Sequence, residues 1–161
     1  MGYKYSKPTN FSETSHSFYA TFKSKEQLFN RCIQRYTDLN FPFLEQALES
    51  ESDYKVVLQN LLESYIDGLM HDDKRKGCFM ANSCSLVAGC SGVEQKMAEH
   101  YSRIGGYFEN FLTRKAVEEA KAKSTSATII TFLIGASQQS KINRNKDSYK
   151  ATVWSIIALL G

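Results

Sequence analysis

The sequence predicts an all-α protein, and three observations lead to that fold class. Apolar residues recur at steps of three and four in almost every periodic stretch, which is the spacing that one face of an α-helix requires. No stretch alternates apolar and polar residues as a half-buried strand would. Of the 161 residues, 42% are hydrophobic, which is enough to bury a sizeable core. We expect about eight helices.

The first clear helix is expected to follow Ser24. The Ser24 hydroxyl can accept a hydrogen bond from the first turn, and Glu26 places a negative charge where the helix dipole favours one. Pro42 lacks an amide hydrogen and its ring clashes with the preceding turn, so we expect it to break or kink the helix, which resumes over residues 43–48. The apolar stripe of this helix consists of Leu28, Phe29, Cys32, Ile33, Tyr36 and Leu39.

Helical periodicity continues along the rest of the chain. A helix is expected from Asp53 to Met70 and another over residues 93–112. The lysine-rich residues 121–126 are expected to separate the latter from an apolar helix that begins at Thr128. A polar loop then leads to the last helix, over residues 149–160.

The last two helices, within residues 128–142 and 149–160, carry large apolar side chains on more than one side. A surface helix needs only one apolar face, so such helices are either central in the core or buried against another chain. We favour a symmetric interface between two copies of the chain. A wholly internal pair of core helices is the alternative.

Composition and charge exclude little. With 20 basic and 17 acidic residues the formal net charge is +3, so any contact with nucleic acid requires a local basic patch. The apolar run from Trp154 to Leu160 is too short to span a bilayer, and the first residues, MGYKYSK, do not form a signal peptide. A cytoplasmic protein is the expectation.

The four cysteines are Cys32, Cys78, Cys84 and Cys90. Their spacing does not match a zinc site, and a chain with this much apolar content does not need disulfides, so we expect free thiols buried in the core. Redox sensing and metal binding are the weaker alternatives. No acid–base pair, nucleophile constellation or glycine-rich phosphate loop is recognisable, so neither an enzyme nor a cofactor is expected.

Two stretches resemble a known family. Ser17, Phe18, Tyr19, Phe22, Ser24, Lys25, Glu26 and Leu28 follow the pattern Ser-Phe-Tyr-x-x-Phe-x-Ser-Lys-Glu-x-Leu. This stretch resembles the junction between the DNA-reading helix and the regulatory domain in TetR-family transcriptional regulators. GCFMAN, at residues 77–82, is similar to the Gly-Cys-Leu-Leu-x-Asn stretch of many members. The resemblance covers nearly the whole chain from residue 15 onward.

The resemblance implies two parts of the chain. Residues 1–24 are expected to be the remnant of a helix-turn-helix DNA-binding domain, and residues 25–161 a larger helical domain for ligand binding and dimerisation. Phe18 and Phe22 would anchor the reading helix in the core. The residues expected to contact DNA are Thr14 and Thr21 beside the backbone, Ser15, His16 and Ser17 at the bases, and Tyr19 and Lys25 at phosphates.

The function implied by the resemblance is transcription regulation. The chain would be a repressor that binds operator DNA as a homodimer through its last two helices and is released by a small-molecule effector, which we expect to be largely apolar. The residues expected to contact the effector are Tyr65, Phe79, Asn82, Ser83, Met97, Tyr101 and Phe108, with Asn82 the foremost because a buried amide needs a partner. The alternative is a dimeric helical module that binds a small molecule or protein but has lost DNA binding.

The beginning of the chain departs from the family pattern. Family members carry a whole helix before the pair that corresponds to Gly2 and Tyr3, and the segment from Gly2 to Phe22 is shorter here. Pro8 and the scarcity of apolar residues around it make a poor helix. We expect that an N-terminal helix is missing from this chain; the other interpretation is a member that no longer binds DNA.

Overall fold

The computed structural model describes residues 22–84 and 91–160. In this part of the chain the secondary structure consists of six α-helices and no strand, which confirms the predicted fold class. The helices are α2 (Lys25–Leu48), α3 (Tyr54–His71), α4 (Phe79–Ser83), α5 (Ser91–Arg114), α6 (Glu119–Gln139) and α7 (Lys146–Ala158).

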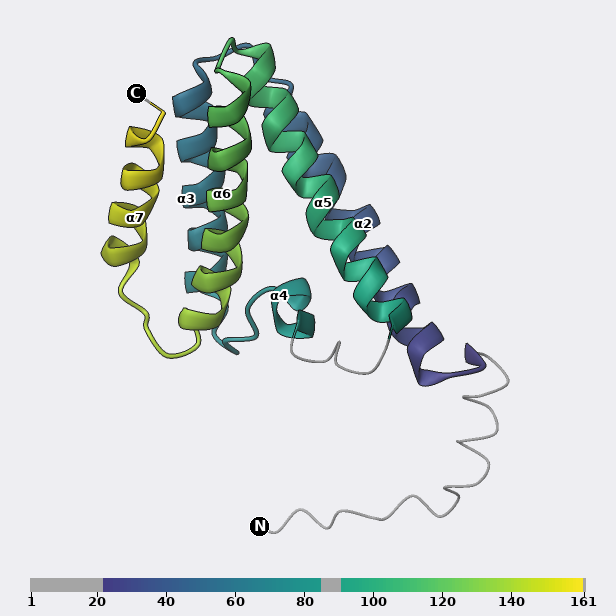
Figure 1. Cartoon of the computed structure of the whole chain (residues 1–161). Coiled ribbons are helices and arrows are strands. Elements are labelled where there is room, and N and C mark those ends of the chain that lie inside the picture. Colours follow the sequence, from purple (N-terminus) through teal and green to yellow (C-terminus); the bar gives the residue numbers. More distant parts are fainter. Residues whose placement is uncertain (1–21, 85–90, 161) are drawn as a thin grey trace, which may run out of the picture.

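The helices form a wedge (Figure 1). α2 and α5 lie side by side and run in the same direction, while α3 and α6 return from the top of the view. The two pairs converge where the short loops 49–53 and 115–118 connect them, and they diverge toward the other end. The short helix α4 lies between the pairs at the divergent end, and α7 packs on the outer side of α3.

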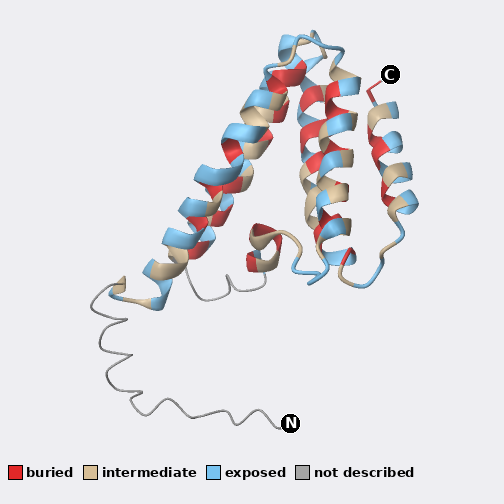
Figure 2. Ribbon diagram, turned by 180° about the vertical axis from the view of Figure 1, so that it is seen from behind, coloured by how far each residue is buried: buried red, intermediate tan, exposed pale blue. Residues whose placement is uncertain are grey.

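The buried parts of the helices lie toward the inside of the wedge (Figure 2), and most of the buried residues are apolar. The largest cluster joins α2, α3, α5, α6 and α7 near the convergent end, and its fully buried members include Leu58, Leu62, Phe108 and Phe111. A second cluster, around Ile33, Met80, Val93 and Met97, joins α2, α4 and α5. A third joins α3, α6 and α7 around Ile66 and Tyr149. Burial of each large side chain contributes about 1.5–3 kcal/mol, so the convergent end carries most of the apolar stabilisation.

Side-chain caps define where the helices begin. Ser24 caps α2 as the sequence predicts, because its Oγ accepts a hydrogen bond of 3.1 Å from the amide of Gln27. Asp53 accepts from the amides of Lys55 and Val56 and starts α3. Glu118 and Asn145 cap α6 and α7 in the same way.

Of the break or kink predicted at Pro42, the break is wrong, since α2 is one helix from Lys25 to Leu48 with Pro42 inside it. Phe41 and Leu48 are buried on either side of the proline, and both pack into the molecule. Pro42 itself is exposed, so its ring lies on the solvent face of the helix. Burial of the continuing apolar face offsets the missing backbone hydrogen bond.

The predicted separator at residues 121–126 is also wrong, because α6 begins at Glu119 and includes it. Alanine and lysine are good helix formers, and Ala122, Thr125 and Ser126 are buried against α5. Ser126 Oγ donates a hydrogen bond of 3.0 Å to the carbonyl oxygen of Gly105. The small polar residues of this stretch therefore form a close contact between α6 and α5. The loop that precedes α6 consists of residues 115–118.

The expectation of buried thiols is wrong for the cysteines that the structure describes. Cys32 and Cys84 are exposed, and Cys78 is half-buried; all three are free thiols. Cys32 occupies a position of the apolar stripe of α2 that extends beyond the packed surface. Cys90 lies outside the described residues.

Candidate functional site

A cavity of about 320 Å³ lies inside the wedge and is lined by residues of α2, α3, α4, α5 and α6. Apolar side chains form most of its wall, among them Phe41, Leu62, Met80, Ile104, Phe108 and Leu133. It exists because the helix pairs diverge below the large apolar cluster before α4 closes the space between them. A mostly apolar cavity with a few polar groups is the usual form of a small-molecule site.

Three tyrosines and a cysteine supply polar groups to this cavity. The hydroxyl of Tyr36 lies 3.2 Å from the Sγ of Cys78, and the hydroxyl of Tyr65 donates a hydrogen bond of 2.9 Å to the carbonyl oxygen of Leu133. The hydroxyl of Tyr101 lies 3.7 Å from the Sγ of Cys84. Burial raises the pKa of Tyr36, Tyr65 and Tyr101, so all three phenols remain neutral.

His100 is a further polar residue of the wall. It lies on α5, where its Nδ1 is 3.0 Å from the Oγ1 of Thr37 on α2 and its ring stacks on that of Phe41 at 5.1 Å. Burial, with a smaller contribution from the charge of Arg103, lowers the pKa of His100 to about 4. The imidazole is therefore neutral at physiological pH.

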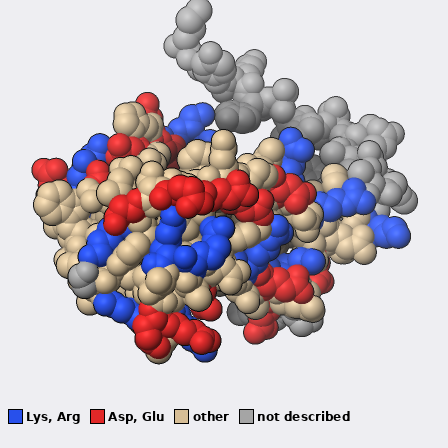
Figure 3. Space-filling view, turned by 90° about the horizontal axis from the view of Figure 1, so that it is seen from above, with Lys and Arg blue, Asp and Glu red and all other residues tan. Residues whose placement is uncertain are grey.

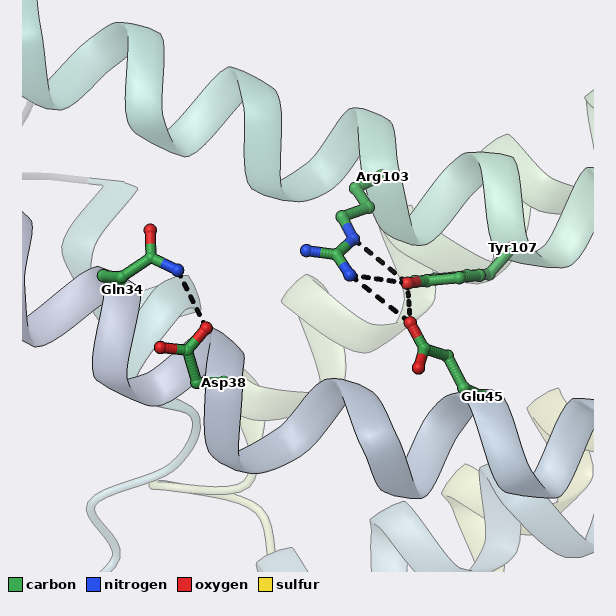
Figure 4. A network of polar contacts seen from close by, with 5 residues as sticks. All are labelled: Gln34, Asp38, Glu45, Arg103 and Tyr107. Atoms are coloured by element: carbon green, nitrogen blue, oxygen red, sulfur yellow. Dashed lines mark hydrogen bonds and ion pairs between the residues drawn. The ribbon is translucent and has the colours of Figure 1, made fainter.

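An ion pair and hydrogen bonds between α2 and α5 compensate the positive charge of Arg103 (Figure 4). Arg103 Nη2 lies 3.3 Å from Glu45 Oε1, and the guanidinium also donates to the hydroxyl of Tyr107. Tyr107 donates in turn to Glu45, and the Arg103 guanidinium covers the ring of Phe41 at 4.5 Å. The network holds α5 to α2 behind the stacked rings of Phe41 and His100. Nearer the beginning of α2, Gln34 donates a hydrogen bond of 2.8 Å to Asp38.

The loop before α4 places Cys78 at the cavity wall. Asp72 accepts hydrogen bonds from the amides of Lys74, Lys76 and Gly77, which folds the loop after α3. Gly77 has a φ of 68°, and a Cβ there would lie 2.8 Å from the Oγ of Ser137. The same Oγ accepts a hydrogen bond of 2.7 Å from the amide of Cys78. A glycine is therefore required where α4 approaches α6.

The cavity brings together some of the residues predicted to bind an effector. Tyr65, Tyr101 and Phe108 line it. Phe79 and Met97 belong to the adjacent apolar cluster of α2, α4 and α5 instead. Ser83 donates its hydroxyl to the carbonyl oxygen of Phe79 within α4.

Asn82 lies on the side of α4 that faces the end of α6. Its side-chain amide donates a hydrogen bond of 2.6 Å to the carbonyl oxygen of Lys76, and its Oδ1 accepts from Gln138 and Lys141. The amide thus has protein partners that hold α4 in place.

Tyr36, Cys78 and His100 are wall residues that sequence reasoning missed. His100 lies in the apolar stripe of α5, between Met97 and Ile104. A titratable residue at a core position was the available signal. Tyr36 was assigned to the stripe of α2 without a role.

Of the residues predicted to contact DNA, the structure describes Lys25 alone, in the exposed first turn of α2. The others, Thr14, Ser15, His16, Ser17, Tyr19 and Thr21, lie outside the described residues. Arg31, two turns further along α2, places its guanidinium 5.7 Å from the ring centre of Phe22. Viewed from above the wedge, acidic side chains form a band across the described surface, and basic side chains lie on either side of it (Figure 3).

No helix in the described part of the chain is both long and apolar enough to cross a membrane. No protein-family model matches the sequence, and no curated protein matches it. Among solved structures, the chain is similar to the TetR family transcriptional regulator CifR, a cysteine mutant complexed with a 26-bp double-strand operator DNA. The similarity covers 89% of this chain and 78% of that chain, with 18% identity and a TM-score of 0.71. The chain has a TetR-like fold. The predicted fold is thereby confirmed.

Proposed function

We propose that the protein is a ligand-responsive transcriptional regulator that represses its target genes by binding operator DNA as a homodimer. The observation that carries this proposal is the cavity in a TetR-like fold, with α2 as one of its walls. Lys25 begins α2, and Tyr36 and Phe41 of the same helix line the cavity. A ligand that displaces the wall of α2 therefore also moves the end of the helix that follows residues 1–24.

Release from DNA follows from the different affinities of the ligand for two arrangements of the helices. The two reading helices of a dimer must lie about one DNA turn, 34 Å, apart to fit an operator. A ligand that binds better to an arrangement with another separation shifts the population away from the DNA-binding form. α4 can take part in this change, because Met80 contacts the cavity on one side and the cluster around Ile33 on the other.

The outer faces of α6 and α7 support the proposed dimer. Large apolar side chains are exposed on α7 and directly after it, with Trp154 at 64% and Leu159 at 60% of full exposure. A shallow groove between the two helices is lined mostly by small residues, including Ala127, Thr131 and Thr152. Small side chains allow helices of a second copy to approach closely.

The dimer is tested by charge substitutions. Ile157→Glu would bury an unpaired charge, at a cost of several kcal/mol, and should dissociate the dimer. Since Ile157 also packs against the core, Thr152→Glu, at an exposed position of the groove, serves as the second variant. Sedimentation velocity should show monomers for both. A folded Thr152→Glu variant that sediments as an undisturbed dimer would remove this interface from the proposal.

DNA binding is tested at Lys25, which is proposed to contact a phosphate. Lys25→Ala should weaken binding to every duplex and reduce the salt dependence by about one unit of slope, because one counterion fewer is released. Lys74→Ala, at an exposed lysine of the loop after α3, is the control and should change neither. Titrations of labelled duplexes at several salt concentrations measure both. An unchanged salt slope in Lys25→Ala would remove the phosphate contact.

Base reading is proposed for His16 and Ser17. His16→Ala should cost about 1–3 kcal/mol on the preferred operator and leave non-specific binding nearly unchanged. These DNA titrations use a protein that carries the N-terminal helix implied by the resemblance, and if that protein binds no duplex even at low salt, the regulator proposal fails. A dimeric module that binds a small molecule without DNA would then be favoured, because the cavity is formed entirely by described residues after Lys25.

A further inference from the structure

The described residues of the cavity wall carry no formal charge. No aspartate, glutamate, lysine or arginine from the described part of the chain lines it. Its titratable groups include three phenols and one imidazole, and burial favours the neutral form of each. The guanidinium of Arg103, which lies 4.5 Å from the centre of the Phe41 ring, is already paired with Glu45. A charged ligand would therefore lose its hydration without gaining a counter-ion.

His100 contributes a ring nitrogen, Nε2, to the polar part of this wall. The side chain of His100 is only 6% exposed, and its Nδ1 is occupied by Thr37. Among the described residues, Nε2 of His100 makes no hydrogen bond. A neutral imidazole offers at Nε2 either a donor or an acceptor, depending on the tautomer. A polar group in a mostly apolar wall can orient a ligand that carries a complementary polar atom.

The cavity opens between α2 and α3. Three of its wall residues are exposed, namely Asn40 and Phe43 on α2 and Ser64 on α3. These two helices contact each other far less than α5 and α6, which close the opposite side. A shallow groove on the surface continues from the opening and shares Phe43, Leu61 and Ser64 with the cavity.

We propose that the effector is an uncharged, largely apolar molecule with one hydrogen-bonding group, which enters between Phe43 and Ser64 and binds Nε2 of His100. This inference rests on the proposed function, since it specifies the ligand of the same cavity. It excludes carboxylates, phosphates and quaternary or primary ammonium compounds as effectors of this site.

The exclusion of charge is tested with two fluorescent probes of the same ring skeleton. Phenylnaphthylamine is neutral, and anilinonaphthalene sulfonate adds one negative charge. Fluorescence titration of the purified protein should give saturable binding of the neutral probe and at least tenfold weaker binding of the sulfonate. Equal affinity for the two probes, or tighter binding of the sulfonate, would overturn the inference.

The position of the opening is tested by a pair of tryptophan substitutions on α3. Ser64→Trp places a large side chain at the opening, whereas Asn60→Trp places one in the outer groove, one turn earlier on the same helix. Both positions are exposed, so both variants should fold. We expect at least tenfold weaker binding of phenylnaphthylamine in Ser64→Trp and an affinity within twofold of the wild type in Asn60→Trp. Undiminished binding in Ser64→Trp would contradict the assigned opening.

The hydrogen bond is tested by comparing naphthol with naphthalene. In the wild type the hydroxyl should increase affinity about tenfold, and in His100→Phe the two compounds should bind equally, because phenylalanine keeps the ring shape without a nitrogen. A tenfold advantage of naphthol that persists in a folded His100→Phe variant would contradict the role of Nε2. The Thr37→Val variant, which removes the partner of Nδ1 and leaves Nε2 in place, should retain the advantage of the hydroxyl.

All these titrations are made without DNA, so they fail independently of the proposed function. Loss of probe binding in a protein that still binds its operator would overturn the inference and leave the regulator intact. Selective probe binding in a protein that binds no duplex would support the inference and overturn the regulator.

Discussion

The two sides of the helical wedge differ in how closely their helices approach. On the α5–α6 side Gly105 leaves room for Ile130, whose Cδ1 would lie 3.2 Å from a Cβ at that position, and Ser126 bonds to the glycine carbonyl oxygen. On the α2–α3 side the facing residues include Phe43 and Ser64, both exposed at the opening of the cavity. Small residues thus allow α5 and α6 to approach closely, whereas α2 and α3 leave an opening for a ligand between Phe43 and Ser64.

The largest expected difference is between a phenylalanine of the core near the convergent end and a phenylalanine at the opening of the cavity. Phe111 is fully buried and Phe43 is 64% exposed. Phe111→Ala should lower the free energy of unfolding by about 3–5 kcal/mol, because it removes buried surface and leaves a cavity. Phe43→Ala should change it by less than about 0.5 kcal/mol. Urea denaturation measures both, and similar losses in the two variants would contradict the described difference in packing.

The helices could be predicted from the sequence because periodicity reports which face of each helix is buried. The stripe Val93, Met97, Ile104, Phe108 and Phe111 lies on α5 as expected. The continuity of α2 through Pro42 could not be predicted, since it depends on α5 packing against the residues on both sides of the proline. The helical state of residues 121–126 depends likewise on the glycine of a different helix.

The candidate site was less accessible to sequence reasoning. Tyr65, Tyr101 and Phe108 were predicted as ligand contacts and line the cavity, whereas Asn82 was selected for a buried amide and bonds to Lys76 and Gln138. The gap between α2 and α3 determines the opening, and no local pattern encodes the distance between two helices. In the sequence, His100 stands out only as a polar residue within the apolar stripe of α5.

The next largest effect concerns the neutral interior. The ordinary pKa of histidine is 6.5, and that of His100 is lowered to about 4, so folding favours the neutral form. The contribution of His100 to the free energy of unfolding is fully present above about pH 6.5 and is lost as the pH falls toward 4. The loss reaches about 3 kcal/mol at most, at about 1.4 kcal/mol for each pKa unit.

The groups that face His100 do not titrate in this range, because they are Arg103, Thr37 and the phenols of Tyr36 and Tyr101. The control is His100→Phe, which should lose this part of the pH dependence while keeping that of the surface carboxylates. Urea denaturation of both proteins between pH 4 and pH 7 measures the difference. Parallel pH profiles would contradict a buried neutral His100.

A third test acts on the sealed side through adjacent glycines of α5. Gly105→Leu forces a side chain toward Ile130 and Ser126 and should cost about 1–3 kcal/mol. A Cβ at Gly106 would meet nothing within 4 Å, and Gly106→Leu should stabilise the helix by about 0.5–1 kcal/mol through its propensity. Thermal and urea denaturation of the two variants should give changes of opposite sign. Equal changes would mean that α5 and α6 can separate without cost.

The smallest expected effect is at the beginning of α2, far from the convergent end of the wedge. Ser24→Ala removes the hydrogen bond to the amide of Gln27 and should cost about 1 kcal/mol. Ser102→Ala, at an exposed position inside α5, removes a hydroxyl from a helix interior and should stabilise by a few tenths of a kcal/mol at about the propensity difference. Because the end of α2 contributes little to the large core, hydrogen exchange of its first-turn amides should accelerate more than exchange at Leu62. Equal acceleration of hydrogen exchange in both regions would mean that the beginning of α2 unfolds only together with the core at the convergent end. The open side of the wedge would then unfold as cooperatively as the sealed side.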